Sequence, residues 1–190
     1  MKIITISGLD GSGKSTQIEL LKKYLESQNK SFYYFHAVEF SIANKSQKSK
    51  VKSQKQGSVT KASWIKIQMR KFALIIDICR FKRLAKKLNA DYVISDRYFY
   101  DSIVNINFLS SNNKILCAEK FISKPDFAFY LKTDPEKIMQ RDRKPDQGIE
   151  YLIKKQELYE AKIESWDIIT IDGEKSKDEI FETIKSYIGK

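Results

Sequence analysis

The sequence predicts an α/β protein in which one five-stranded parallel sheet lies between two layers of helices, a three-layer α/β/α arrangement. Short, nearly continuous apolar segments alternate along the chain with longer segments whose apolar residues recur at helical spacing. The apolar segments lack the alternation of a strand with one solvated face, so helices should cover both faces of the sheet. A glycine-rich turn follows the first apolar segment and leads into a helical one. Ligands bind such sheets at the carboxyl ends of the strands.

The expected strands and helices follow one another in regular order. Strands are expected at residues 2–7, 31–36, 92–95, 127–131 and 167–171. Helices are expected at residues 14–28, 64–88, 99–109 and 114–121, from Pro135 onward, and at 150–164 and 176–188. Ile18, Leu21 and Leu25 give the first helix an apolar face. Asp134 is an N-cap, and Pro135 after it is favoured at the first helical position.

Two polar segments between these elements are expected to be mobile. Residues 44–61 contain Lys, Ser and Gln with almost no apolar residue, which predicts an arm. Residues 141–148 form a polar loop that contains Pro145 and Gly148. The 190 residues otherwise fit one domain that spans residues 1–190.

Composition argues against a membrane or secreted protein. No apolar run approaches the ~20 residues of a spanning helix. Met1-Lys2 leads directly into the first strand, so we expect no secretory leader. Cys79 and Cys117 form neither a disulfide framework nor a metal-spaced cluster. These features predict a cytoplasmic protein.

The net charge of +11 comes from one segment of the chain. Residues 44–87 hold 14 Lys/Arg and one acid, Asp77, whereas the remaining residues hold 21 Lys/Arg and 23 acids. Such a block attracts nucleic acid, acidic surfaces or phosphates. A nucleotide-responsive nucleic-acid-binding protein is therefore one hypothesis, although Trp64 and Phe72 are the only aromatic residues near the arm.

The glycine-rich turn matches the phosphate-loop pattern G-x-x-x-x-G-K-[ST] between a strand and a helix. Its backbone N–H groups would surround phosphate oxygens, and the helix dipole would favour the same anion. Lys14 would reach the β and γ phosphates, and the Ser15 hydroxyl would contact Mg²⁺. The expected ATP-binding residues are Gly8, Gly11, Ser12, Gly13, Lys14, Ser15 and Thr16. The alternative is an ordinary glycine-rich turn between a strand and a helix.

The third strand ends in an acid followed by a base, Asp96-Arg97. Asp96 at this position could hold Mg²⁺ beside the phosphate loop, together with Ser15. Arg97 could bind a phosphate with two parallel hydrogen bonds. The alternative is an Asp96–Arg97 ion pair that only closes the strand.

Three motifs in this order resemble the thymidylate kinases. They are Gly-Leu-Asp-Gly-Ser-Gly-Lys-Ser-Thr at 8–16, Asp-Arg-Tyr at 96–98 and Pro-Asp-Phe-Ala-Phe-Tyr-Leu-Lys-Thr-Asp-Pro-Glu at 125–136. The resemblance continues to Tyr159 and is weak over residues 37–75. It implies a P-loop kinase fold and transfer of the ATP γ-phosphoryl group, with Mg²⁺, to the 5′-phosphate of a deoxynucleoside monophosphate, first of all dTMP. It also implies a homodimer formed through the helices near 64–88 and 99–109.

The same resemblance implies roles for individual residues. Lys14 holds the donor phosphates, and Arg97 holds the acceptor phosphate. Asp10 stands where the family binds the sugar 3′-hydroxyl. Arg141 and Arg143 belong to a lid over residues 141–148, and they supply the cation that a loop with Gly11 and Ser12 lacks. Arg80 stands on the long helix where the family has an arginine facing the acceptor.

The acceptor pocket is where the sequence departs from the family. Val38 stands in place of an acceptor-phosphate arginine. Ile76 stands in place of a phenylalanine that stacks on thymine, and Phe72 is one helical turn away. Asp101, Ser102 and Asn105 are the polar residues available to read the base. A carboxylate at 101 would read an amino group or bind only water, so a kinase acting on another nucleotide or nucleoside stays open as an alternative.

Overall fold

The computed structural model describes residues 1–43, 64–110, 116–142 and 144–189. The expected arm at 44–61 and Arg143 therefore lie outside the described residues. No helix in the described ranges is long and apolar enough to cross a membrane.

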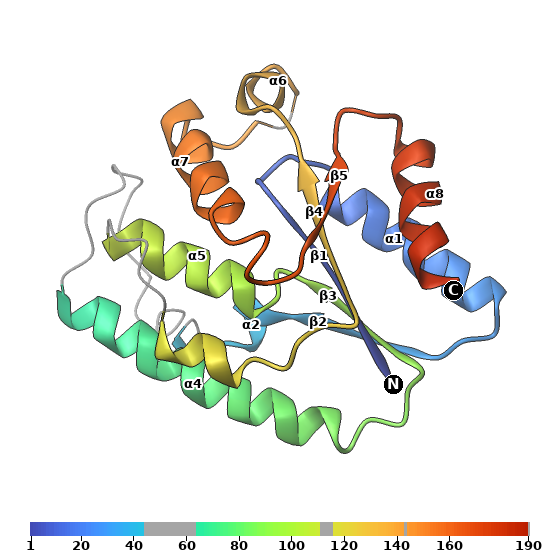
Figure 1. Ribbon diagram of the computed structural model, residues 1–190, viewed down its shortest axis with the longest axis horizontal. Helices are drawn as coiled ribbons and strands as arrows, with labels where there is room; N and C mark the ends of the chain where they lie inside the picture. Colours follow the sequence, from blue (N-terminus) through green and yellow to red (C-terminus); the bar gives the residue numbers. More distant parts are fainter. Residues whose placement is uncertain (44–63, 111–115, 143, 190) are drawn as a thin grey trace.

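Five parallel strands form one sheet at the centre of the molecule (Figure 1). The sheet order is β2 (Phe32–His36), β3 (Tyr92–Asp96), β1 (Lys2–Gly8), β4 (Phe127–Lys132) and β5 (Ile169–Asp172). β1 lies in the middle, with β3 on one side and β4 on the other. The five-stranded parallel sheet expected from the sequence is confirmed.

Helices cover both faces of the sheet, as the apolar strands require (Figure 1). α1 (Lys14–Ser27) and α8 (Lys177–Ile188) pack on one face. α4 (Trp64–Ala85), α5 (Phe99–Ser110) and α7 (Ile149–Glu160) lie on the other. Three shorter helices, α2 (Ala37–Phe40), η1 (Cys117–Phe121) and α6 (Pro135–Met139), complete the described elements.

In β1, β3 and β4, neighbouring residues enter two separate cores. In β4, Ala128 and Tyr130 join the core under α4, α5 and α7, whereas Phe129 and Leu131 join the core under α1 and α8. All four of these residues are at most 5% exposed. Burial on both faces explains why β4 reads as a continuous apolar run. It also holds the loops at the strand ends in fixed positions.

The structure differs from the sequence expectation at several elements. The helix expected at 64–88 ends at Ala85, and the one expected at 150–164 spans Ile149–Glu160. α2 was not expected, and it forms because His36 accepts a hydrogen bond at Nδ1 from the Glu39 N–H, 3.3 Å away. η1 begins only at Cys117 and is a 3₁₀ helix. β5 begins two residues later than expected, because Asp167 has a left-handed backbone with φ of 52°.

Candidate active site

The phosphate loop lies between the end of β1 and the start of α1. Gly11 and Gly13 have φ values of 87° and 97°, which favour glycine. At Gly8 an added Cβ would lie 2.7 Å from Ser12 Oγ and 2.9 Å from the Leu131 carbonyl oxygen. The glycines therefore let the loop turn sharply and pass close to β4.

Lys14 is held inside this loop. Its side chain is 6% exposed, and its Nζ donates to the Leu9 carbonyl oxygen at 2.6 Å. Burial lowers the pKa of Lys14 and Arg97 adds to this effect, while Asp10 and other carboxylates oppose it. Ser12 Oγ is buried without a hydrogen-bond partner among the described residues. A buried cation and a buried hydroxyl without a partner in the described residues thus lie in the loop that is expected to bind phosphate.

Asp96 closes β3 next to the phosphate loop. Asp96 lies opposite Ile6 of β1 in the parallel ladder, and it is 9% exposed. Tyr34 donates from its hydroxyl to Asp96 Oδ2 at 3.5 Å, whereas Oδ1 is buried with no partner in the described ranges. Ser15 is exposed at the first turn of α1. These oxygen donors have the chemistry that Mg²⁺ prefers.

Arg97 does not form the ion pair with Asp96 that was the alternative to phosphate binding. It adopts a left-handed backbone with φ of 55°, and its Nη2 donates instead to Asp10 Oδ1. The Tyr151 hydroxyl donates to the other oxygen of Asp10 at 3.5 Å. Burial alone would raise the pKa of Asp10, but Arg97, Lys14, Lys155 and Tyr151 together hold it below the ordinary value. Asp10 is therefore a carboxylate with one strong ionic partner.

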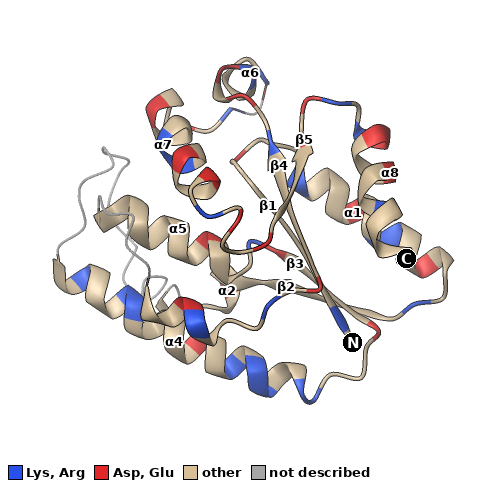
Figure 2. Cartoon of the chain, in the orientation of Figure 1, with Lys and Arg blue, Asp and Glu red and all other residues tan. Residues whose placement is uncertain are grey.

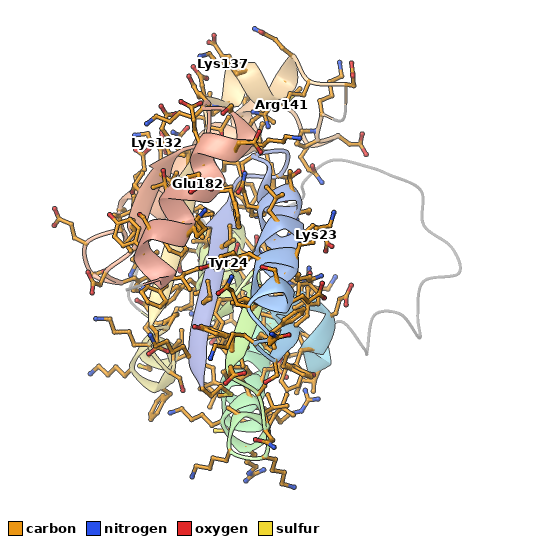
Figure 3. The ribbon with its side chains drawn as sticks, turned by 90° about the vertical axis from the view of Figure 1, so that its right-hand side faces the viewer. Lys23, Tyr24, Lys132, Lys137, Arg141 and Glu182 are labelled. Atoms are coloured by element: carbon orange, nitrogen blue, oxygen red, sulfur yellow. The ribbon has the colours of Figure 1, made fainter. Side chains whose placement is uncertain are left out.

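Arg141 is a second arginine that contacts the candidate site, at the phosphate loop. It follows α6, whose N-cap Asp134 accepts from the Glu136 N–H at 2.8 Å, as expected from the sequence. Its Nη1 donates to the Gly11 carbonyl oxygen. Figure 3 shows Arg141 near the end of the molecule where α1 begins. One of the two expected lid arginines thus lies at the site, and Arg143 lies outside the described residues.

A small cavity lies between α2, α4 and α5. Arg70 and Asp77 line it from α4, and Ser102 and Asn105 line it from α5. Of the residues expected to read the base, Asn105 and Ser102 therefore face this cavity. Arg70 and Asp77 were not expected, and neither stands in a motif.

Three residues expected at the acceptor pocket do not line this cavity. Phe72 is 67% exposed, and neither it nor Ile76 lines the cavity. Arg80 also faces elsewhere: it pairs with Asp77 at 2.7 Å and donates to the Phe40 carbonyl oxygen at 3.0 Å. Its guanidinium lies 4.3 Å from the centre of the Phe40 ring. Asp77, one turn earlier on α4, forms an ion pair with Arg80, and the guanidinium lies against Phe40 of α2.

Asp101 does not line this cavity either, and its role toward the base stays a prediction. It is 5% exposed and accepts hydrogen bonds from Ser7 Oγ at 2.8 Å and from the Tyr159 hydroxyl. Burial raises its pKa above the ordinary value, although these hydrogen bonds and the charges of Lys14 and Arg97 oppose the change. Asp101 joins α5 to β1 and α7 beneath the phosphate loop.

Sequence reasoning missed one face of α7. Tyr151, Lys155 and Tyr159 follow each other at four-residue spacing and approach Asp10 and Asp101. The available signal was this spacing, because residues at i, i+4 and i+8 lie on one face of a helix.

Comparisons with known proteins agree with this geometry. A family model described as thymidylate kinase matches residues 6–184. A probable thymidylate kinase 1 of Saccharolobus solfataricus is 28% identical and is aligned over 100% of this chain and 97% of its own. A probable thymidylate kinase of Methanocaldococcus jannaschii is 27% identical, with 97% and 94% covered.

Solved structures support the same fold. A thymidylate kinase from Ehrlichia chaffeensis superposes with a TM-score of 0.60 at 15% identity, covering 98% of each chain. One from Candida albicans gives 0.62 at 20% identity, covering 99% of this chain and 91% of its own. Because the family model spans nearly the whole chain and the phosphate loop and its neighbouring acid and arginine lie together, this chain belongs to the thymidylate kinase family.

Proposed function

We propose that this protein transfers the γ-phosphoryl group of ATP to the 5′-phosphate of dTMP, giving ADP and dTDP. The observation that carries the proposal is the phosphate loop with buried Lys14 beside the Asp10–Arg97 pair. The loop suits a donor triphosphate, and the pair suits a sugar and a phosphate next to it. The names of the curated relatives support dTMP as the acceptor.

The chemical step needs positioning and positive charge more than a general base. An oxygen of the acceptor 5′-phosphate attacks the γ-phosphorus, and a new P–O bond forms. The bond between that phosphorus and the β,γ-bridging oxygen breaks, and ADP leaves with the electron pair. The attacking oxygen is already anionic, so no proton must be removed. Lys14, Arg97 and Arg141 would neutralise the charge that spreads over the transferred group.

Mg²⁺ is part of this proposal. Ser15 and Asp96 would hold it, and the unpartnered Asp96 Oδ1 supports that assignment. When bound, Mg²⁺ supplies positive charge to the β and γ phosphates of ATP.

The acceptor would displace contacts present in the free protein. Its phosphate would take Arg97 from Asp10, which frees Asp10 to accept a hydrogen bond from the sugar 3′-hydroxyl. The base would then extend toward the cavity lined by Arg70, Ser102 and Asn105. The exchange keeps Arg97 paired with an anion, because the acceptor phosphate takes the place of the Asp10 carboxylate.

The test is ADP release from ATP and Mg²⁺ with dTMP, dUMP, dCMP, CMP, UMP, dAMP and dGMP supplied separately. We expect the highest kcat/KM with dTMP. Lys14→Ala should lose kcat by orders of magnitude while its thermal unfolding stays cooperative, because its charge acts on the transferred group. Lack of turnover with every acceptor, while ATP binds, would contradict the proposal.

A homodimer is a second part of the proposal. Trp64, Ile65, Met69 and Phe72 of α4 are 62–72% exposed, and a second copy of the chain would cover such an apolar face. In Figure 2 the Lys and Arg bands of the α4 ribbon are separated by tan segments of uncharged residues. The cytoplasmic location stays a prediction. Nucleic-acid binding by this protein also stays a prediction, and neither the family match nor the fold favours it.

A further inference from the structure

Lys155 is a buried lysine that the chemistry above does not use. It lies on the inner face of α7, the helix above α5 in Figure 1, and is 7% exposed. The next residue back, Lys154, is exposed on the same helix. The Lys155 Nζ lies 4.9 Å from the centre of the Tyr151 ring. Since buried lysines are rare unless paired, its environment is informative.

The charges around Lys155 are those of the candidate active site. Asp10 and Asp101 are the carboxylates that act most strongly on its amine, followed by the like charges of Arg97 and Lys14. Within the described ranges the Lys155 Nζ makes no hydrogen bond or ion pair. The ammonium therefore faces the site without being held by a protein acceptor.

Both nearby carboxylates already have other partners. Asp10 accepts from Arg97 and Tyr151, and Asp101 accepts from Ser7 and Tyr159. A lysine whose only role were to neutralise one of them would be expected to contact it directly, as Arg97 contacts Asp10. Lys155 instead remains available to an anion that enters between α7 and the loop.

The protonation state of Lys155 is suited to binding an anion. Burial is the largest influence and lowers its pKa to about 8, with Arg97 and Lys14 adding to the effect and Asp10 and Asp101 opposing it. The amine is thus mostly protonated at neutral pH. A bound dianion would favour the protonated form and raise the pKa again.

We propose that Lys155 binds the 5′-phosphate of the acceptor nucleotide together with Arg97. This inference rests on the proposed function and adds to it a substrate-binding cation from α7. The acceptor is favoured over the donor because Lys155 lies over the ring of Tyr151, whose hydroxyl donates to Asp10, the carboxylate that Arg97 contacts. The donor side already has Lys14, and Arg141 contacts the loop at Gly11.

The experiment compares a ligand that has the phosphate with one that lacks it. Binding of dTMP and of thymidine is measured by calorimetry for the wild type, Lys155→Met, Lys155→Arg and the exposed control Lys154→Met. Lys155→Met should weaken dTMP binding roughly 10- to 100-fold, the range for loss of a charged hydrogen bond, with thymidine binding unchanged. Lys155→Arg should retain most of the affinity, and Lys154→Met should match the wild type.

The pH dependence gives a second readout. As pH rises through about 8, dTMP affinity of the wild type should fall with loss of the Lys155 proton, whereas Lys155→Arg should lack that decline. Other groups that titrate there act equally in both proteins. The groups that face Lys155 are Asp10, Lys14, Arg97, Asp101, Tyr151 and Tyr159.

Each other outcome overturns the proposal. Equal weakening of dTMP and thymidine would make Lys155 a counter-charge for Asp10 and Asp101. A rise in the KM for ATP alone would assign it to the donor. Unchanged dTMP binding in Lys155→Met, with normal wild-type binding, would refute the Lys155 proposal alone. Failure of the wild type to bind dTMP would refute the proposed function and this inference together.

Discussion

We expect Tyr159→Phe to destabilise the protein, because the Tyr159 hydroxyl donates a hydrogen bond to the buried Asp101 beneath the phosphate loop. The substitution keeps the ring, which packs 5.0 Å from the Tyr130 ring, and removes only the hydroxyl that donates to Asp101. Asp101 is then left with one side-chain donor, Ser7 Oγ at 2.8 Å. A hydrogen bond to a charged group contributes about 1.5–3 kcal/mol, so we expect a loss of that size. For a chain of this length, that corresponds to a fall in Tm of about 3–12 °C.

The pH dependence of this loss has a defined sign. Burial raises the folded pKa of Asp101 above its ordinary value of 3.8. Its favourable contribution to stability is therefore fully present below that value and is lost as pH rises through the folded pKa. The Tyr159 hydroxyl offsets part of this loss by stabilising the charged form. The difference between Tyr159→Phe and the wild type should thus be largest near neutral pH and should shrink on acidification.

The assay is thermal and urea unfolding over a pH series, with Tyr130→Phe as the matched control. The Tyr130 hydroxyl is buried without a partner among the described residues, so its removal should cost little or stabilise the protein. The base selectivity of Tyr159→Phe should match that of the wild type, because Asp101 does not face the cavity. Equal Tm values for Tyr159→Phe, Tyr130→Phe and the wild type near neutral pH would refute the reasoning.

Three further predictions concern the loop, the core and the exposed helix face. Gly8→Ala should lower kcat/KM roughly 10²-fold in steady-state assays, because its Cβ would lie 2.7 Å from Ser12 Oγ and displace the loop; wild-type kinetics would contradict this. Glu119→Ala removes the carboxylate that lies 3.1 Å from the buried Lys162 amine, and it should lower the free energy of unfolding, measured in urea, by about 3–5 kcal/mol. A decrease below 1 kcal/mol, the size expected for a surface ion pair, would contradict this prediction. Met69→Glu should convert the proposed dimer to monomers in sedimentation experiments, and a dimer that persists would argue against α4 as the interface.

The sequence predicted those parts of the protein that depend on neighbouring residues. The apolar strands, the first helix and the phosphate loop are each specified within a few residues, so pattern and spacing are sufficient to identify them. The position of Asp96 and Arg97 at the end of β3 follows from the same local pattern. The partner of Arg97 does not, because Asp10 is 87 positions away in the sequence.

The acceptor pocket could not be predicted in the same way. Helical spacing places Asp101 on α5 but does not show which face of α5 packs against β1 and α7. Ser7 of β1 and Tyr159 of α7 donate hydrogen bonds to Asp101 from those elements. The partners of Arg80 could not be predicted either, because Asp77, at i−3 on the same helix, holds its guanidinium near Phe40. These are consequences of packing between elements that are distant in sequence.

The most direct test of the account follows the transferred phosphorus itself. ATP labelled at the γ-phosphate is incubated with the protein, Mg²⁺ and dTMP, and the products are separated and counted. The account predicts that the label enters dTDP, in equal amount to the ADP formed, and that Lys14→Ala abolishes the transfer. Label that appears as inorganic phosphate, or that remains in ATP although ATP binds, would contradict phosphoryl transfer to dTMP as the function of this site.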